Sequence, residues 1–126
     1  MMILQSGGAC DKAAIIGLDG SILSDPLLVS FKLTTQESTV IGIGMMESDM
    51  SYPSLRENGI IVEGIRYDFL RADDNMVWGR KQGEGTITME RSKQNVVICH
   101  TKEGDNLGNA KRVVEKVVDS FEYYGY

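Results

Sequence analysis

The stretch of residues 59–90 most constrains the fold of this chain, because short runs of alternating apolar and polar side chains fill it. Turn-forming residues separate these runs at positions 63–64, 72–75 and 82–85. Such alternation is typical of strands with one buried and one exposed face. The stretch therefore predicts an antiparallel meander of short strands.

The run at residues 65–71 shows two contrasting faces. Because side chains alternate along a strand, one face collects the apolar residues Ile65, Tyr67 and Phe69. The other face collects Arg66, Asp68 and Leu70. We expect the first face to hold the sheet together and the second to meet a binding partner.

Segments on either side of the meander supply further strands. Residues 13–18 form an apolar run, and Asp19-Gly20 is a strong turn signal that leads into residues 21–23. Residues 95–100 form a continuous apolar strand, and a turn is expected at residues 101–105. We therefore expect a hairpin near the start of the chain and a buried strand after the meander.

Two helices are expected. Residues 34–46 predict a helix that begins with a capping box, since Thr34 and Glu37 have the T-x-x-E spacing. Residues 105–124 predict an amphipathic helix, whose apolar residues recur every three or four positions: Ala110, Val113, Val114, Val117, Val118 and Phe121. Residues 47–58 indicate a polar loop, and residues 1–8 a short helical stub. This order of elements predicts an α+β domain with one antiparallel sheet.

Length and charge limit the class of protein. A chain of 126 residues fits one domain, and we expect residues 1–126 to form it. The net charge of −5 and the pI of about 4.8 argue against nucleic-acid binding. The sequence has no apolar run of membrane-spanning length and no signal-peptide pattern, so we expect a cytoplasmic protein.

The sequence gives no argument for an enzyme. Cys10 and Cys99 form neither a CxxC motif nor a cluster with His, so we expect buried thiols in a reducing compartment rather than a disulfide or a zinc site. His100, the only histidine, ends an apolar strand with no nucleophile motif beside it. Asp73-Asp74 and residues 82–85 are interpreted as turns, not as an acidic pair or a phosphate-binding loop. We therefore expect neither a metal nor a cofactor.

Several short motifs together resemble the profilin family in their order and spacing. The run AAIIGLDGS at residues 13–21 resembles the first hairpin of profilins, and EGIRY at residues 63–67 resembles one of their strands. Further matches follow in order: RADD at 71–74, WGRK at 78–81, GTIT at 85–88, VVEK at 113–116 and GY at 125–126. The resemblance implies a single antiparallel sheet with N- and C-terminal helices on one face and a shorter helix on the other. It also implies that the first helix of this chain is shortened.

Profilins are small cytosolic proteins without enzymatic activity that bind monomeric actin, proline-rich segments and phosphoinositides. The resemblance therefore implies a monomeric, actin-binding protein of the cytoskeleton that regulates filament assembly. Carried over position by position, the actin surface comprises Arg66, Asp68, Leu70, Arg71, Arg80, Lys81, Asn106, Gly108, Lys111 and Lys116. Actin's matching surface in this family is acidic with an apolar patch, which a basic cluster around Leu70 would suit.

Phosphoinositide binding would use an overlapping set of basic residues: Arg66, Arg71, Arg80, Lys81, Lys111 and Arg112. We expect this binding to be weak at a net charge of −5.

The proline-rich site departs from the family pattern. Profilins build this site from aromatic rings on the first hairpin and the two terminal helices, which grip a polyproline II ligand. Here Leu23 stands at the position of the hairpin tryptophan, and Ser120 at that of the usual histidine or tyrosine on the last helix. Three tyrosines remain near the end of the chain: Tyr123, Tyr124 and Tyr126. We expect proline-rich binding to be weak, altered or lost.

Two alternatives stay open at this point. The first is a small sensor or adaptor domain of similar layout, PAS-like or roadblock-like, that binds a small ligand or dimerises. It rests on the order of the elements alone. The second is a profilin-like protein that kept actin binding, lost proline-rich binding and sequesters actin.

Overall fold

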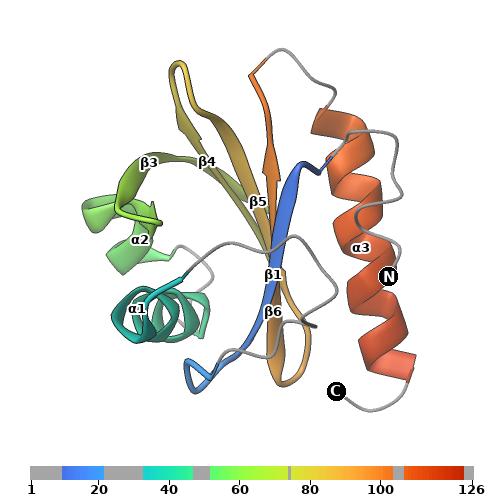
Figure 1. Cartoon of the computed structure of the whole chain (residues 1–126). Coiled ribbons are helices and arrows are strands. Elements are labelled where there is room, and N and C mark those ends of the chain that lie inside the picture. Colours follow the sequence, from blue (N-terminus) through green and yellow to red (C-terminus); the bar gives the residue numbers. More distant parts are fainter. Residues whose placement is uncertain (1–9, 22–32, 47–51, 74, 104–106, 124–126) are drawn as a thin grey trace.

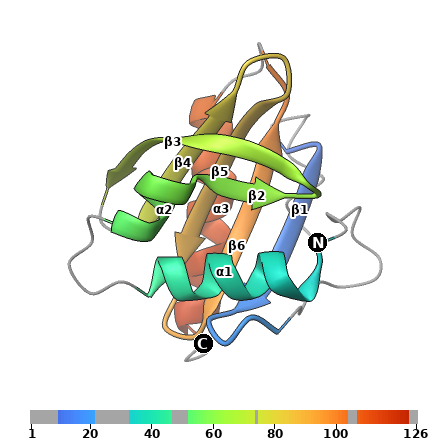
Figure 2. The ribbon, with the colours of Figure 1, turned by 90° about the vertical axis from the view of Figure 1, so that its left-hand side faces the viewer.

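In the residues that the computed structural model describes (10–21, 33–46, 52–73, 75–103 and 107–123), six strands form one antiparallel sheet. Their order across the sheet is β1-β6-β5-β4-β3-β2 (Figures 1 and 2). The strands are β1 (Lys12–Gly17), β2 (Ile60–Val62), β3 (Ile65–Asp73), β4 (Met76–Lys81), β5 (Gly85–Arg91) and β6 (Asn95–Thr101). The helices are α1 (Thr35–Met45), α2 (Pro53–Asn58) and α3 (Leu107–Tyr123). The predicted meander and the α+β class are confirmed.

β6 connects the early and late parts of the chain, because it pairs with β1 on one side and with β5 on the other. Its register with β1 runs from Lys12 opposite His100 to Gly17 opposite Asn95. All of its residues are buried, as expected for a strand covered on both faces. The predicted turn at Asp19-Gly20 follows β1, whereas the second arm of the hairpin, including Leu23, lies outside the described residues.

Helices cover both faces of this sheet (Figures 1 and 2). α3 lies on one face and buries its apolar stripe of Ala110, Val114, Val117 and Val118 in a cluster with Trp78 of β4. α1 and α2 lie on the other face, where Ile41, Met45 and Leu55 join the larger core cluster. Each fully buried aliphatic side chain contributes about 1.5–3 kcal/mol to folding. The burial of the apolar stripe of α3 confirms the predicted amphipathic helix, while the stub expected at residues 1–8 lies outside the described residues.

The polar loop expected at residues 47–58 is wrong in its second half, where α2 forms. Pro53 occupies the first helical position, where its fixed φ angle suits the helix. Leu55 is the buried residue of α2, and one buried side chain in six residues gives no periodic apolar pattern. A Cβ atom at Gly44 would lie 2.8 Å from Leu55 Cδ2, so this glycine allows α2 to approach α1 closely.

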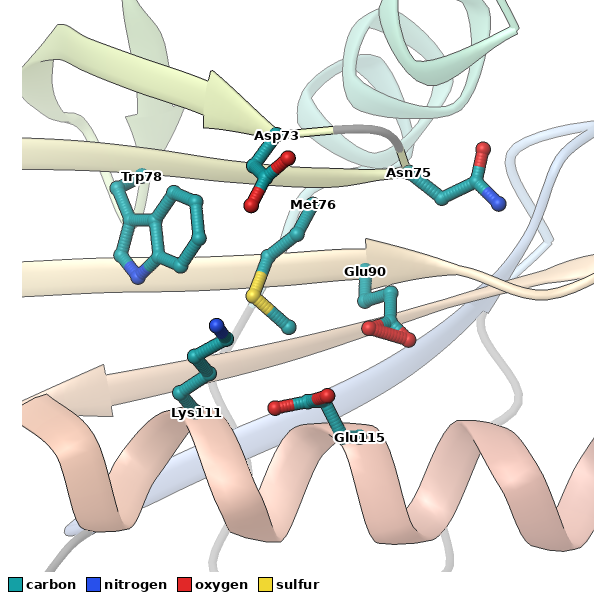
Figure 3. Close-up of a pocket in the computed structure, with 7 residues that line it drawn as sticks. All are labelled: Asp73, Asn75, Met76, Trp78, Glu90, Lys111 and Glu115. Carbon is teal, nitrogen blue, oxygen red and sulfur yellow. The ribbon is translucent and has the colours of Figure 1, made fainter.

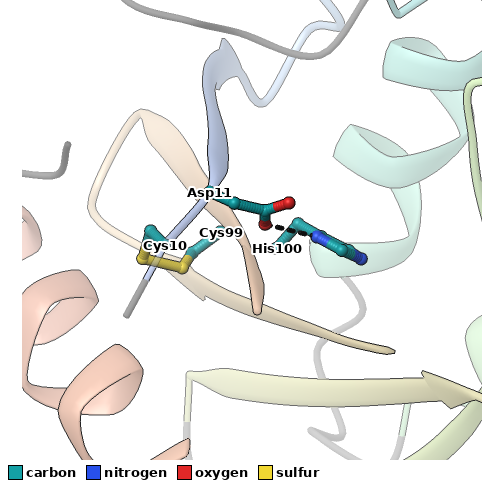
Figure 4. The surroundings of a disulfide bond; sticks show 4 residues. All are labelled: Cys10, Asp11, Cys99 and His100. Carbon is teal, nitrogen blue, oxygen red and sulfur yellow. Dashed lines mark hydrogen bonds and ion pairs between the residues drawn. A yellow bond between two sulfur atoms is a disulfide. The ribbon is translucent and has the colours of Figure 1, made fainter. Parts of the chain in front are cut away.

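The expectation of two free thiols is also wrong, because Cys10 and Cys99 form a disulfide (Figure 4). The two residues are 89 positions apart, and their Cα atoms lie 5.7 Å apart. Their proximity follows from the pairing of β1 with β6, which sets Ala13 opposite Cys99. Sequence spacing alone carries no signal for a contact that depends on this long-range pairing.

Glu37 joins the start of α1 to the turn between β2 and β3. The predicted capping box is confirmed: Thr34 Oγ1 accepts from the Glu37 amide at 3.1 Å, and the Thr34 amide donates to Glu37 Oε1 at 3.1 Å. The same carboxylate accepts from the amide of Glu63 at 3.2 Å and from that of Gly64 at 2.8 Å. One carboxylate therefore satisfies the amides of a helix start and of a tight turn.

We predict that Glu37→Gln destabilises the protein by about 1–2 kcal/mol, because glutamine offers one acceptor oxygen and no charge to these amides. Urea unfolding measures the change. Gln36→Ala, one position away on the exposed side of α1, is the control and should stay within about 0.5 kcal/mol of the parent protein. Equal midpoints for Glu37→Gln and the parent would contradict the role of this carboxylate.

Candidate functional site

The outer strands leave part of the sheet uncovered on the α3 side. α3 packs on β5 and β6, whereas β3 lies two strands beyond β5, with β4 between them. Five exposed side chains of β3 and β4 lie on this uncovered part, and we name them the open strand face: Arg66, Asp68, Leu70, Arg71 and Arg80. The structure thus brings together five of the residues expected to contact actin.

A β-bulge shapes the centre of the open strand face. Phe69 pairs with Gly79 and Arg71 pairs with Trp78, so Leu70 is the extra residue between two paired positions. The bulge shifts the alternation by one residue, and both Leu70 and Arg71 are exposed as a result. Leu70 is 51 % exposed. The face therefore carries an apolar side chain between charged ones.

Arg71 stacks on the only tryptophan of the chain. Its guanidinium carbon lies 4.4 Å from the centroid of the Trp78 ring, within the range of a cation–π contact. Trp78 is only 2 % exposed, because the arginine covers it on one side and the α3 cluster on the other. The position of Arg71 is therefore fixed by the core beneath it.

Arg80 is restrained by an acidic residue that follows β6. Its Nη2 atom lies 2.9 Å from Glu103 Oε1, and the other oxygen of Glu103 accepts from the Gly83 amide in the β4–β5 turn. Asp68 is the cross-strand neighbour of Arg80. Sequence reasoning missed Glu103, because a glutamate in an expected turn has no pattern that links it to a strand 23 positions earlier.

Arg66 lies at the far end of the open strand face. Its Nε atom is 3.5 Å from Asp68 Oδ1, and its Nη2 atom is 3.4 Å from the carbonyl oxygen of Glu57, near the end of α2. The side chains of Arg66 and Asp68 are more than half exposed, so their ion pair contributes little to stability. Both groups remain accessible to a partner.

The other basic residues expected in the actin or phosphoinositide site are spread more widely. Lys81 follows Arg80 in β4, so strand alternation directs it to the opposite face. Lys111 projects from α3 towards the sheet, whereas Arg112 and Lys116 are exposed. Lys116 follows Lys111 by five positions, a rotation of about 140° on a helix, and so faces away from β4. Gly108 lies in the first turn of α3, and Asn106 is outside the described residues.

A pocket of about 170 Å³ lies between β4, β5 and α3, beside the open strand face (Figure 3). Met76 and Trp78 contribute its apolar wall, and Lys111 approaches them from α3. Four other polar residues complete the lining: Asp73, Asn75, Glu90 and Glu115. Sequence reasoning assigned none of these four to the site, because they lie on three separate elements and one turn. The pocket extends the exposed surface from β3 towards α3.

The structure describes little of the expected proline-rich site. Leu23, Tyr124 and Tyr126 lie outside the described residues, and Ser120 lies in α3. The ring of Tyr123, which is 83 % exposed, lies in the last turn of α3.

His100, to which sequence reasoning assigned no catalytic role, is engaged at both ring nitrogens. Its Nδ1 atom lies 2.5 Å from Asp11 Oδ1, and its Nε2 atom lies 2.7 Å from the carbonyl oxygen of Glu84. The ring also makes an edge contact with Tyr67, at 6.0 Å between centroids. His100 therefore links β6, the segment before β1 and the β4–β5 turn.

Tyr67 lies beside this histidine on the buried side of β3. Burial raises the pKa of the Tyr67 phenol to about 12. Nearby carboxylates act in the same direction: Glu84, Glu63 and Asp11. In the folded protein, the Tyr67 phenol therefore stays neutral at pH values where an ordinary tyrosine is already ionised.

The profilin family model matches residues 2–126 of this chain. A profilin from Strongylocentrotus purpuratus is 36% identical over 118 residues, which cover 90% of this chain and 82% of that protein. The crystal structure of Schizosaccharomyces pombe profilin has a TM-score of 0.82 at 28% identity, covering 99% of this chain and 94% of the other. LokiProfilin2, solved in complex with rabbit actin, has a TM-score of 0.70 with 93% and 90% of the chains covered, and at 17% identity shows a shared fold alone.

We predict that the stability of the parent protein falls as the pH rises from about 10 to about 12. The unfolded phenol ionises near pH 10 while the folded phenol of Tyr67 stays neutral until about 12, so ionisation favours the unfolded state in this window. Tyr67→Phe should show a shallower fall in the unfolding free energy, measured by urea titration at each pH. The control is Tyr123→Phe, which changes an exposed ring. Parallel pH profiles for Tyr67→Phe and the parent would contradict this account.

Proposed function

The chain belongs to the profilin family, and on that premise we propose that it binds monomeric actin and regulates filament assembly through the open strand face. The observation that carries the proposal is the exposure of Leu70 between arginines on a part of the sheet that α3 does not cover. An apolar anchor within a ring of charges is the arrangement typical of binding hot spots. The role proposed is binding, without catalysis.

The arginines of the open strand face are held in place before any partner arrives. Arg71 is stacked on Trp78, and Arg80 is paired with Glu103. Side chains that are already ordered lose less conformational entropy on binding, which favours affinity. Guanidinium groups also form bidentate contacts with carboxylates, so this surface suits an acidic partner.

Local charge explains how an acidic chain can attract an acidic surface. The net charge is −5, but the open strand face carries three arginines and one aspartate. Fields close to the contact surface depend on the nearest charges, because salt screens distant ones over about 10 Å. The remaining negative charge on Asp68 disfavours wrong registers of docking and so adds specificity.

Phosphoinositide headgroups would meet the same arginines, so we propose that they compete with actin. The overall charge of −5 keeps this binding weak. The alternative of a sensor or adaptor domain rested on the order of the elements alone, and membership of the profilin family removes that reason for it. A sequestering role stays open as one form of the proposed regulation.

We predict that the parent protein slows the spontaneous assembly of pure monomeric actin and co-migrates with it at tens of micromolar. Arg71→Glu should weaken this binding at least about 10-fold, because it places a carboxylate at the centre of the contact. Leu70→Ser should also weaken it, and it alters no buried contact of the core. Light scattering measures the slowed assembly, and analytical gel filtration measures the co-migration with actin.

Lys93→Glu is the matched control for this experiment. Lys93 is exposed in the turn between β5 and β6, so its substitution makes the same charge change as Arg71→Glu away from β3. Equal weakening by both variants would point to net charge rather than the open strand face. A parent protein that neither slows assembly nor co-migrates with actin would refute the proposed function itself.

We also predict that a proline-rich peptide binds weakly, with no saturable heat in calorimetry below about 1 mM. The reason is the loss of two ring positions, now Leu23 and Ser120, from the pattern of the family. Tyr123→Ala is the control that removes an exposed ring. Clear micromolar affinity of the parent protein, lost in Tyr123→Ala, would contradict the interpretation of Leu23 and Ser120.

A further inference from the structure

We propose that the Cys10–Cys99 disulfide is a reversible redox switch that sets how α3 is seated on the sheet. The bond lies in the cluster that holds α3, with Cys10 3% and Cys99 0% exposed. Ala110, Val114 and Val117 of α3 belong to the same cluster. A consequence for actin binding, which rests on the function proposed above, follows because Trp78 belongs to this cluster and Arg71 stacks on Trp78.

Other links hold the same two segments together without the disulfide. The Asp11 amide donates to the His100 carbonyl at 3.0 Å, and the Asp11 carboxylate lies 2.5 Å from His100 Nδ1 (Figure 4). Asp11 and His100 each follow a cysteine in sequence, and strand alternation places the His100 side chain on the face opposite to Cys99. Reduction therefore removes the link on the α3 side and leaves the links on the other side intact. This asymmetry makes the bond a local switch rather than the support of the whole sheet.

A buried hydroxyl is placed to receive the reduced state. Thr88 is the cross-strand neighbour of Cys99, and its Oγ1 atom is buried with no hydrogen-bond partner in the part of the chain that the structure describes. Directly opposed side chains on one face have Cβ atoms about 4.5–5.5 Å apart, within reach of each other. A disulfide sulfur has no hydrogen to donate, whereas a Cys99 thiol has one. The hydroxyl that lacks a partner in the oxidised state thus gains one on reduction.

Packing transmits the change of state to α3. Two thiols must take up a van der Waals separation where two sulfurs were bonded, and the surrounding side chains are almost completely buried. Closely packed interiors respond to such a change by shifting neighbouring side chains and helices. α3 is the helix that packs against the bond, so it is the one that shifts.

The chemistry is a thiol–disulfide exchange with a dithiol reductant. The dithiol attacks one sulfur, forms a mixed disulfide and then closes its own ring disulfide. Two electrons and two protons move from the dithiol to the protein, and Cys10 and Cys99 become thiols. Because both sulfurs are buried, the exchange requires the segment before β1 to open transiently.

The test equilibrates the folded protein with dithiothreitol and then adds excess N-ethylmaleimide in denaturant, which exposes and traps the buried thiols for counting by mass. We expect two thiols, a shifted Trp78 emission spectrum and amide exchange at least about 10-fold faster in α3, with β1 and β6 unchanged. No trapped thiols in the folded protein would overturn the proposal, because the bond would be permanent. Two thiols with unchanged Trp78 emission and α3 exchange would overturn it as well, and so would loss of protection throughout the sheet.

Variants separate the parts of the proposal. The double variant Cys10→Ala/Cys99→Ala should respond to dithiothreitol in none of these measurements. Thr88→Val should raise the dithiothreitol concentration needed for half reduction by about 2- to 10-fold, because the reduced state loses its hydrogen bond. Thr86→Val is the matched control on the same face of β5, opposite Thr101. Equal concentrations for Thr88→Val and the parent would overturn the role of the hydroxyl.

Actin binding by the oxidised and reduced proteins tests the consequence separately. We expect the reduced form to bind at least about 3-fold more weakly, because α3 and Trp78 support the open strand face. Equal affinities would overturn the link between the switch and binding. If the oxidised protein does not bind actin, the proposed function fails, while thiol trapping, Trp78 emission and exchange still decide whether the switch exists.

Discussion

The pairing of β1 with β6 is the interaction on which the rest of the structure depends. It joins segments from opposite ends of the chain, from Lys12 opposite His100 to Gly17 opposite Asn95. It places β6 between two neighbouring strands, where β6 is buried on both faces. One face packs against α3, and the other adds to the core around α1. Closing such a non-local ladder costs conformational entropy, so the links at its end matter. A main-chain hydrogen bond, a side-chain hydrogen bond between Asp11 and His100 and a disulfide all hold that end.

Local sequence patterns predicted the parts of this fold that depend on interactions between residues close in sequence. The alternation at residues 65–71, the capping box of Thr34 and Glu37 and the apolar stripe of α3 are each set by neighbours within a few positions. Features that depend on distant segments were missed. The disulfide requires the β1–β6 pairing. The contact of Arg80 with Glu103 requires the end of β4 to meet the segment after β6, and α2 has one buried leucine and therefore no period. The bulge at Leu70 was also missed, although it explains why Leu70 and Arg71 are both exposed.

The open strand face combines exposure with order. Its position follows from the sheet, because α3 packs on β5 and β6 and leaves the outer strands open. Its order follows from contacts with the protein itself, since Trp78 supports Arg71 and Glu103 restrains Arg80. The same Trp78 lies in the cluster that contains the disulfide. The state of a bond near the start of β1 can therefore reach a surface on β3 through side-chain packing, without a change in the sheet.

Among the described residues, no helix is long and apolar enough to cross a membrane.

The most direct test of the account is hydrogen–deuterium exchange of this protein with and without monomeric actin. The account predicts slower exchange in β3 and β4 and in the first turns of α3, with little change in α1 on the opposite face of the sheet (Figure 2). Both the location and the asymmetry follow from contact at the open strand face and the neighbouring pocket. Protection confined to α1, or no protection anywhere at saturating actin, would contradict the account.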